Sequence, residues 1–120
     1  MFDHIGLKVR DLAACTDFYR SALAALGHVL GASGEGYAGF GPPDEPALWL
    51  YQHTLGSTPG THVAFRAPDR AAVQRFHEQG LAAGGRDNGA PGLRPDYSPN
   101  YYAAFLIDPD GNNVEAVCFS

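Results

Sequence analysis

The chain has 120 residues, of which 45% are hydrophobic and 18% charged, a balance typical of an ordinary folded globular protein. Its formal net charge is −5 and its eight basic residues are scattered singly, which argues against nucleic acid and anionic membranes as partners. No apolar run is long enough to cross a membrane and no signal peptide opens the chain, so a cytoplasmic location is expected.

The N-terminal half predicts a strand, a helix and three further strands. Residues 2–9 alternate between apolar and other side chains, which is typical of a strand, and His4 lies on the face opposite to the apolar one. Asp11 is a good N-cap for the helix that follows, and Gly27 is a good residue to end it. Three short strand candidates come next, separated by turn residues: 28–32, 36–42 and 47–53.

The second half repeats the first. Residues 4–27 align with residues 62–85 at a constant offset and without a gap, so that His4 coincides with His62. Internal repetition of this kind indicates one supersecondary unit used twice. We therefore expect a single domain made of two modules and a linker: residues 1–55, residues 61–120, and residues 56–60 between them.

The segment after the second helix differs from its counterpart in the first module. Residues 86–100 contain three prolines and two glycines, and are predicted to form a long irregular loop. Loops of this length are commonly lids or binding loops. Residues 101–107 and 114–119 are predicted strands joined by a turn.

Three polar residues stand at strand positions where apolar residues are expected. His4 and His62 open equivalent strands, on the face that the helices leave uncovered, and Glu115 lies between apolar neighbours. A buried carboxylate is costly unless it is paired or bound to a cation. If the modules pair about a pseudo-twofold axis, the three residues form a 2-His-1-carboxylate set for a divalent metal. Each residue alone is more commonly structural, and the repeat is what favours the metal site.

Three segments carry a resemblance to a known family: DHIGLKVRDL, FYRSAL and DPDGNNVEAV. With them, the chain resembles the vicinal oxygen chelate superfamily of glyoxalases, bleomycin resistance proteins and extradiol dioxygenases, over essentially its whole length. The resemblance implies an α+β fold in which two βαβββ modules pair into an eight-stranded, open, cup-shaped barrel that binds a divalent metal ion. Carried over by position, the metal ligands are His4, His62 and Glu115.

The last strand of the first module departs from the family pattern. Glyoxalase I-like members have a fourth ligand there, usually an acid, and residues 47–52 contain none. Trp49 falls at the ligand position and Gln52 is the nearby donor; whether either replaces the fourth ligand stays open. Three protein ligands fit better with the extradiol dioxygenase and fosfomycin-resistance thiol transferase branches. The set suits iron, zinc, manganese or nickel without choosing among them.

The resemblance implies a divalent-metal-dependent enzyme, a glyoxalase-like lyase or a dioxygenase, that acts on a small substrate with vicinal oxygens. Tyr101 and Tyr102 are the candidate catalytic proton carriers. Substrate contacts are expected from aromatic side chains and one anion anchor, although strand packing explains the aromatic residues equally well: Trp49, Tyr51, Tyr97 and Arg94. The alternative is a metal-free small-molecule (drug) binding protein of the bleomycin-resistance type. A homodimer is implied in either case, and whether one chain or two complete the site stays open.

Overall fold

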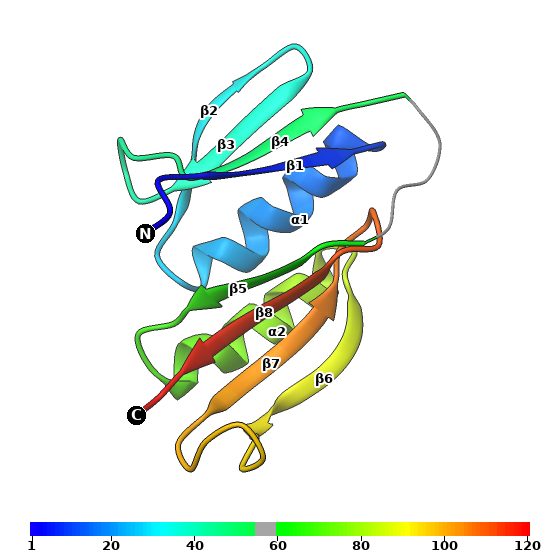
Figure 1. The fold of residues 1–120 in the computed structure, drawn as a ribbon. Coiled ribbons are helices and arrows are strands. Elements are labelled where there is room, and N and C mark those ends of the chain that lie inside the picture. Colours follow the sequence, from blue (N-terminus) through cyan, green and yellow to red (C-terminus); the bar gives the residue numbers. More distant parts are fainter. Residues whose placement is uncertain (55–59) are drawn as a thin grey trace.

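The computed structural model describes residues 1–54 and 60–120 and confirms two βαβββ modules of the α+β class (Figure 1). Of the predicted linker, only Gly60 lies within the described residues. The first module comprises β1 (Ile5–Val9), α1 (Leu12–Ala24), β2 (Val29–Gly34), β3 (Tyr37–Gly41) and β4 (Leu48–Gln52). The second comprises β5 (His62–Arg66), α2 (Arg70–Ala82), β6 (Arg86–Leu93), β7 (Tyr102–Ile107) and β8 (Asn113–Cys118).

Each module forms one four-stranded sheet, and the two sheets have the same topology. Their strand orders are β1-β4-β3-β2 and β5-β8-β7-β6, with the first strand parallel to the last and the other neighbours antiparallel. The sequence repeat is therefore a repeat of topology. Among the described residues no strand ladder joins the two sheets, so the eight strands do not close into a barrel.

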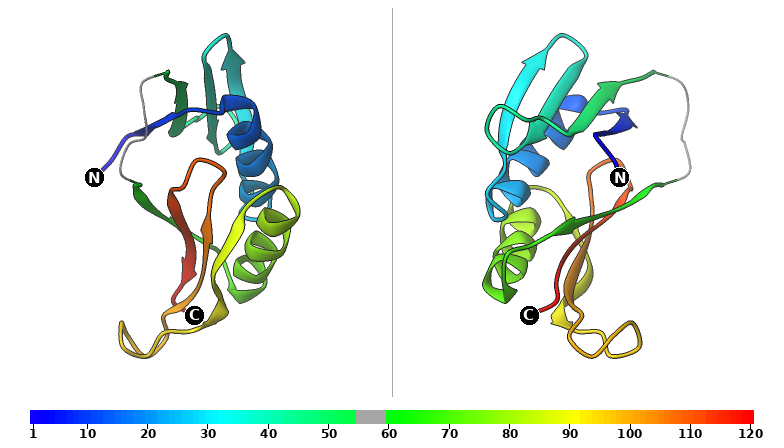
Figure 2. Two further views of the ribbon diagram at one scale, coloured as in Figure 1. Left: turned by 90° about the vertical axis from the view of Figure 1, so that its right-hand side faces the viewer. Right: turned by 60° about the vertical axis from the view of Figure 1, so that its left-hand side comes forward.

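The two helices begin where the sequence predicts. The side chain of Asp11 accepts a hydrogen bond from the backbone N–H of Ala14 at 3.0 Å, and that of Asp69 accepts one from Ala72 at 2.8 Å. Such a cap stabilises a helix by about 1 kcal/mol. Both helices lie on one side of the sheets, next to each other (Figure 2). Their buried faces and both sheets share a single hydrophobic core.

Two glycines of the second module make room for an aromatic ring of the first. A Cβ atom on Gly85 would lie 2.5 Å from Cε1 of Phe18 and 2.9 Å from the carbonyl oxygen of Gly80. A Cβ atom on Gly80 would lie 3.3 Å from the same Phe18 atom. Phe18 belongs to α1 and is fully buried. The contact between the modules therefore depends on the absence of a side chain at Gly85, whereas a Cβ atom on Gly80 would first meet Leu106 of its own module, at 2.3 Å.

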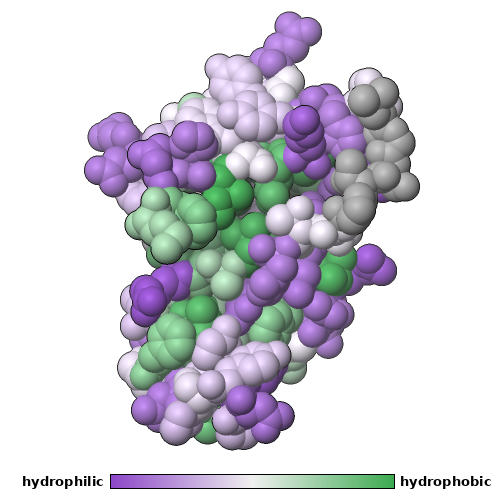
Figure 3. All heavy atoms as spheres, in the orientation of Figure 1, coloured by the Kyte–Doolittle hydropathy of each residue, from purple (hydrophilic) through white to green (hydrophobic). Residues whose placement is uncertain are grey.

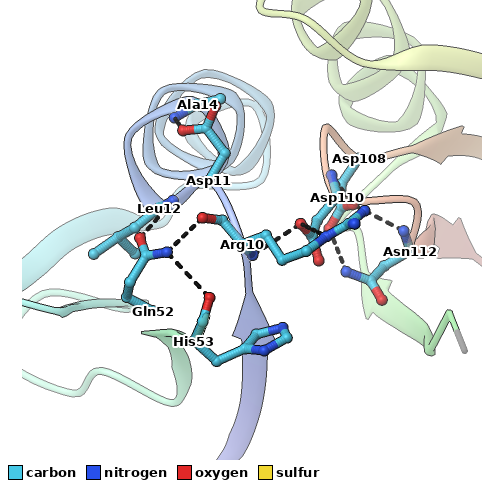
Figure 4. Close-up of polar contacts among 9 residues, drawn as sticks. All are labelled: Arg10, Asp11, Leu12, Ala14, Gln52, His53, Asp108, Asp110 and Asn112. Carbon is cyan, nitrogen blue, oxygen red and sulfur yellow. Dashed lines mark hydrogen bonds and ion pairs between the residues drawn. The ribbon is translucent and has the colours of Figure 1, made fainter. Parts of the chain in front are cut away.

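The DPDGNN turn, between β7 and β8, fastens the second module to the first (Figure 4). The buried Asp108 carboxylate accepts hydrogen bonds from both the backbone and side-chain nitrogens of Asn112, at 2.8 and 2.9 Å, and from the Asp110 backbone at 2.9 Å. It also accepts one from the Tyr19 hydroxyl in α1 at 2.6 Å. The carboxylate of Asp110 in turn accepts from the backbone N–H of Arg10, at 2.9 Å. The motif therefore connects the modules.

The prediction of a loop over residues 86–100 is wrong in its first part, because residues 86–93 form β6. The strand lies at the edge of its sheet, where Pro91 is tolerated since one side of an edge strand forms no ladder. Its register against β7 shifts between Asp87 and Gly89 and again between Gly89 and Gly92. Glycine and proline, read in the sequence as turn signals, here mark a bulged edge strand.

The faces of the two sheets that point away from the helices are open on the same side of the molecule (Figures 1 and 2). In the space-filling view of this side, hydrophobic atoms gather across its middle, between the two sheets (Figure 3). Any site formed by the strand residues opposite the helices has to lie on these open faces.

Candidate functional site

The open face of the second sheet brings together side chains from three neighbouring strands. The register places His62 of β5 beside Asn113 of β8, and Glu115 of β8 beside Phe105 of β7. Successive residues of a strand point to opposite faces, so these alternate residues share the face that α2 does not cover. Tyr101, just before β7, joins them.

The carboxylate of Glu115 is the centre of this group. Its side chain is 3% exposed, and its Oε1 atom lies 3.1 Å from Nε2 of His62. Its Oε2 atom accepts a short hydrogen bond from the hydroxyl of Tyr101. Both oxygens of the buried carboxylate therefore have a protein partner, as a buried charge requires.

His62 is the member of the group that reaches solvent. Its side chain is half exposed, and its Nδ1 atom lies 3.2 Å from the carbonyl oxygen of Asn113. The ring stacks over Phe105 at 6.4 Å between centroids. Both polar partners of the imidazole are acceptors, so the nitrogen that carries the proton decides which contact is a hydrogen bond.

Tyr101 and Tyr102 lie on opposite sides of the sheet. Desolvation and the Glu115 carboxylate raise the pKa of Tyr101 to about 12, so its hydroxyl is a proton donor at neutral pH. The Tyr102 hydroxyl instead accepts a hydrogen bond from Gln74 of α2 at 2.9 Å, and its ring lies 4.8 Å from the Arg70 guanidinium. The structure thus groups Tyr101 with Glu115 and places Tyr102 on the helix side.

Two of the residues expected to contact substrate, Arg94 and Tyr97, also lie beside this group. They line a cavity of about 310 Å³ together with residues of β6, β7 and β8: Asn88, Gly89, Phe105 and Asn113. The ring of Tyr97 meets that of Tyr101 edge to face at 5.0 Å. Asn88, Asn113 and Phe105 were missed in the sequence. Strand alternation could have identified Phe105, because it places this residue on the same face of the sheet as Glu115.

The other predicted residues belong to the first sheet. The register places Trp49 beside Gly6 and Tyr51 beside Lys8 on its open face. The Trp49 ring lies across Gly39, where a Cβ atom would come within 2.6 Å of it. These rings form a surface of their own and do not join the Glu115 group.

His4 lies apart from the other two predicted ligands. Its Nδ1 atom pairs with the carboxylate of Asp3 at 2.7 Å, and its side chain is 58% exposed. It lines a separate, largely apolar cavity of about 180 Å³ together with residues of β1, β4 and β5. Within residues 1–54 and 60–120 no three His, Cys, Asp or Glu side chains are grouped to hold a metal ion. The 2-His-1-carboxylate metal site therefore stays a prediction, of which the structure brings His62 and Glu115 into contact.

Gln52, the other residue considered for a fourth ligand, has a structural role (Figure 4). Its Oε1 atom accepts a hydrogen bond from the backbone N–H of Leu12 at 3.2 Å. Its Nε2 atom donates to the carbonyl oxygens of Arg10 and His53. The amide thus joins the end of β4 to the start of α1.

Two βαβββ modules, with a cluster of polar side chains on an open sheet face, define an α+β protein built from paired modules. Comparisons with known proteins identify its family. Residues 1–116 match the family model described as Glyoxalase/Bleomycin resistance protein/Dioxygenase superfamily, and the chain belongs to this superfamily. The comparison with curated proteins gives no match. No helix among the described residues is long and apolar enough to span a membrane.

Solved structures share the fold along almost the whole chain. A glyoxalase/bleomycin resistance protein from Albidiferax ferrireducens T118 is 28% identical, with a TM-score of 0.84 and 98% of each chain covered. A glyoxalase/bleomycin resistance protein/dioxygenase family enzyme from Burkholderia phytofirmans PsJN is 17% identical, with a TM-score of 0.73 and 98% of each chain covered. A glyoxalase-related enzyme from Fulvimarina pelagi is 18% identical, with a TM-score of 0.73, covering 94% of this chain and 84% of that one. The last two similarities concern the fold alone.

Proposed function

We propose that this superfamily member binds a small molecule on the open face of its second sheet, at His62, Glu115 and Tyr101, without needing a metal ion there. The observation that carries the proposal is the Glu115 carboxylate, which is buried and yet contacted from both sides by groups that face an open surface. A buried charge is expensive, and its use to orient a histidine and a tyrosine next to a cavity is typical of a binding site.

The three residues have different tasks in this proposal. Glu115 fixes the orientation of the other two through its two oxygens. The half-exposed imidazole of His62 is the group among the three that a ligand can reach most directly. Aromatic rings on either side supply flat apolar contact: Phe105, Tyr97 and Phe119.

The test is a ligand screen by protein-detected NMR with metal-free protein, compared between wild type and Glu115→Gln. Gln keeps the shape of Glu115 and removes its charge, so we expect binding to weaken by about tenfold or more, as for a lost charge-assisted hydrogen bond. The matched control is Trp49→Phe on the first sheet, which should leave binding unchanged. Ligands whose shifts map to the first sheet, or affinities indifferent to Glu115→Gln, would refute the site.

A metal-dependent enzyme, a glyoxalase-like lyase or dioxygenase, is the second candidate. The 3.1 Å contact of His62 and Glu115 favours it, because these residues are two of the three predicted ligands. Completion of the set would require His4 as well, from the same chain or from a second copy in a homodimer. Elemental analysis of the protein as purified, with sedimentation to determine its oligomeric state, tests this candidate. Stoichiometric metal that His4→Ala and His62→Ala both remove supports it, and metal-free protein that takes up no added zinc, iron, manganese or nickel rejects it.

A further inference from the structure

The Arg94 guanidinium is held in place but has no anionic partner among the described residues. Its Nη2 atom donates to the carbonyl oxygen of Ala90 at 2.7 Å and Nη1 to that of Leu93 at 3.5 Å. Its Cζ atom lies 5.4 Å from the centre of the Phe105 ring. Arg10 and Arg20 each pair with an aspartate, whereas Arg94, like Arg66, Arg70, Arg75 and Arg86, forms no ion pair in the described chain. An oriented, unpaired guanidinium beside a cavity is suited to bind an anion.

The bulged strand β6 shapes the cavity around this guanidinium. A Cβ atom on Gly89, whose φ is +153°, would lie 3.0 Å from the Phe105 ring and 3.3 Å from Nη2 of Arg94. A Cβ atom on Gly92 would lie 3.2 Å from Nη1. Two glycines at the register shifts thus leave the space that side chains would fill. Bulges of this kind commonly re-aim side chains next to binding sites.

Two amides complete the polar wall of the cavity. Nδ2 of Asn88 donates to Oδ1 of Asn113 at 3.2 Å. Each amide has a further donor or acceptor, and both residues line the same cavity as Arg94. A carboxylate on the guanidinium can therefore accept an additional N–H bond from Asn113.

From these contacts we infer that the site takes a small, flat monocarboxylate, an aromatic or heteroaromatic acid whose carboxylate lies on Arg94 and whose ring lies along Phe105 and Tyr97. This inference rests on the proposed function and names its ligand class. One guanidinium balances the single negative charge of a carboxylate. It would leave one charge of a phosphate dianion unbalanced, which is unfavourable in a protein of net charge −5. The cavity of about 310 Å³ is at the small end of ligand sites, which run from roughly 300 Å³ upward.

Benzoate, benzamide and phenyl phosphate are the probes, titrated by calorimetry and by amide NMR of metal-free protein. We expect benzoate to bind more tightly than the other two and to shift the side-chain amide signals of Asn88 and Asn113. Arg94→Gln should weaken the binding of benzoate by about tenfold or more and leave the affinity for benzamide unchanged. Arg94→Lys keeps the charge and loses the paired N–H groups. Its affinity for benzoate should therefore lie between those of Arg94→Gln and wild type.

Arg66→Gln is the matched control, because Arg66 lies on the same sheet face and stacks over Phe119 at 5.2 Å. It should leave benzoate affinity unchanged. Equal affinity for benzoate and benzamide, or indifference to Arg94→Gln, overturns the carboxylate inference; the proposed function survives if Glu115→Gln still weakens the bound ring compound. Failure of every compound in the ligand screen, the three probes included, to bind the second sheet overturns both.

Discussion

The hydroxyl of Tyr19 donates a 2.6 Å hydrogen bond to the carboxylate of Asp108, although the first residue lies in α1 and the second begins the turn between β7 and β8. Both residues are fully buried or nearly so. The bond joins the two modules at a point where a solvent molecule cannot replace either partner. The stability of the paired modules should therefore depend on it.

Tyr19→Phe should lower the free energy of unfolding by about 1.5–3 kcal/mol, the usual contribution of a hydrogen bond to a charged group. Asp108→Ala should cost more, because it leaves the Tyr19 hydroxyl and the Asn112 amide without an acceptor. Urea denaturation measures both. Asp17→Asn, at an exposed residue paired only weakly with Arg20, is the control and should change little. Equal stability of Tyr19→Phe and wild type would contradict the prediction.

In an alkaline titration, Tyr101 and Tyr19 should ionise at higher pH than ordinary tyrosines. Tyr101 has a pKa of about 12 against an ordinary 10.0, mainly through desolvation and then through Glu115, and burial raises that of Tyr19 well above 10.0. Because the folded state favours the neutral phenol, this stabilisation is fully present below pH 10.0 and, for Tyr101, is lost as pH rises through about 12. Tyrosinate absorbance during an alkaline titration measures it. Tyr101→Phe should remove a late component, and an unchanged late phase would contradict the assignment.

Gly85→Ala should destabilise the protein by about 1–3 kcal/mol, the range for overpacking a filled core. The added methyl group would meet the buried ring of Phe18 and a backbone oxygen, and neither can move freely. Thermal unfolding measures the loss. Double substitution with Phe18→Leu should recover part of it by making room. A simple sum of the two single losses would show that the ring is not the obstacle.

Gln52→Ala should lower stability by about 1 kcal/mol, since three backbone groups lose a side-chain partner with partial replacement by water. Gln74→Ala, which removes one exposed hydrogen bond to Tyr102, is the control and should cost less. Denaturant midpoints of the two variants decide the comparison. A smaller loss for Gln52→Ala than for Gln74→Ala would contradict the structural role.

The repeat made the fold predictable, because equivalent caps such as Asp11 and Asp69 mark the same helix in each copy. The bulged strand β6 was not predictable from local pattern, since its glycines and Pro91 serve an edge position that only tertiary structure defines. Turn chemistry and edge-strand chemistry use the same residues. The sequence alone does not separate them.

The candidate site was predictable in part. Neighbouring strands of one sheet bring His62 and Glu115 together, and alternation in the sequence places them on one face. Alternation also separates Tyr101 from Tyr102. The position of His4 relative to that pair depends on how one sheet is set against the other, which periodicity within a strand does not determine. For this reason the sequence predicts on which face of its sheet a residue lies, and it does not predict the distances between residues of different sheets.

The single core that α1 and α2 share has a consequence for the independence of the two halves. Each helix packs on its own sheet and also on the other helix, so neither half by itself could hide all of its apolar surface from water. Two polypeptides produced by a cut between Thr54 and Gly60 should therefore behave as complementing fragments, each unfolded or aggregated when alone and ordered when the two are mixed. The two modules, although similar in sequence, would then fold as a single cooperative unit.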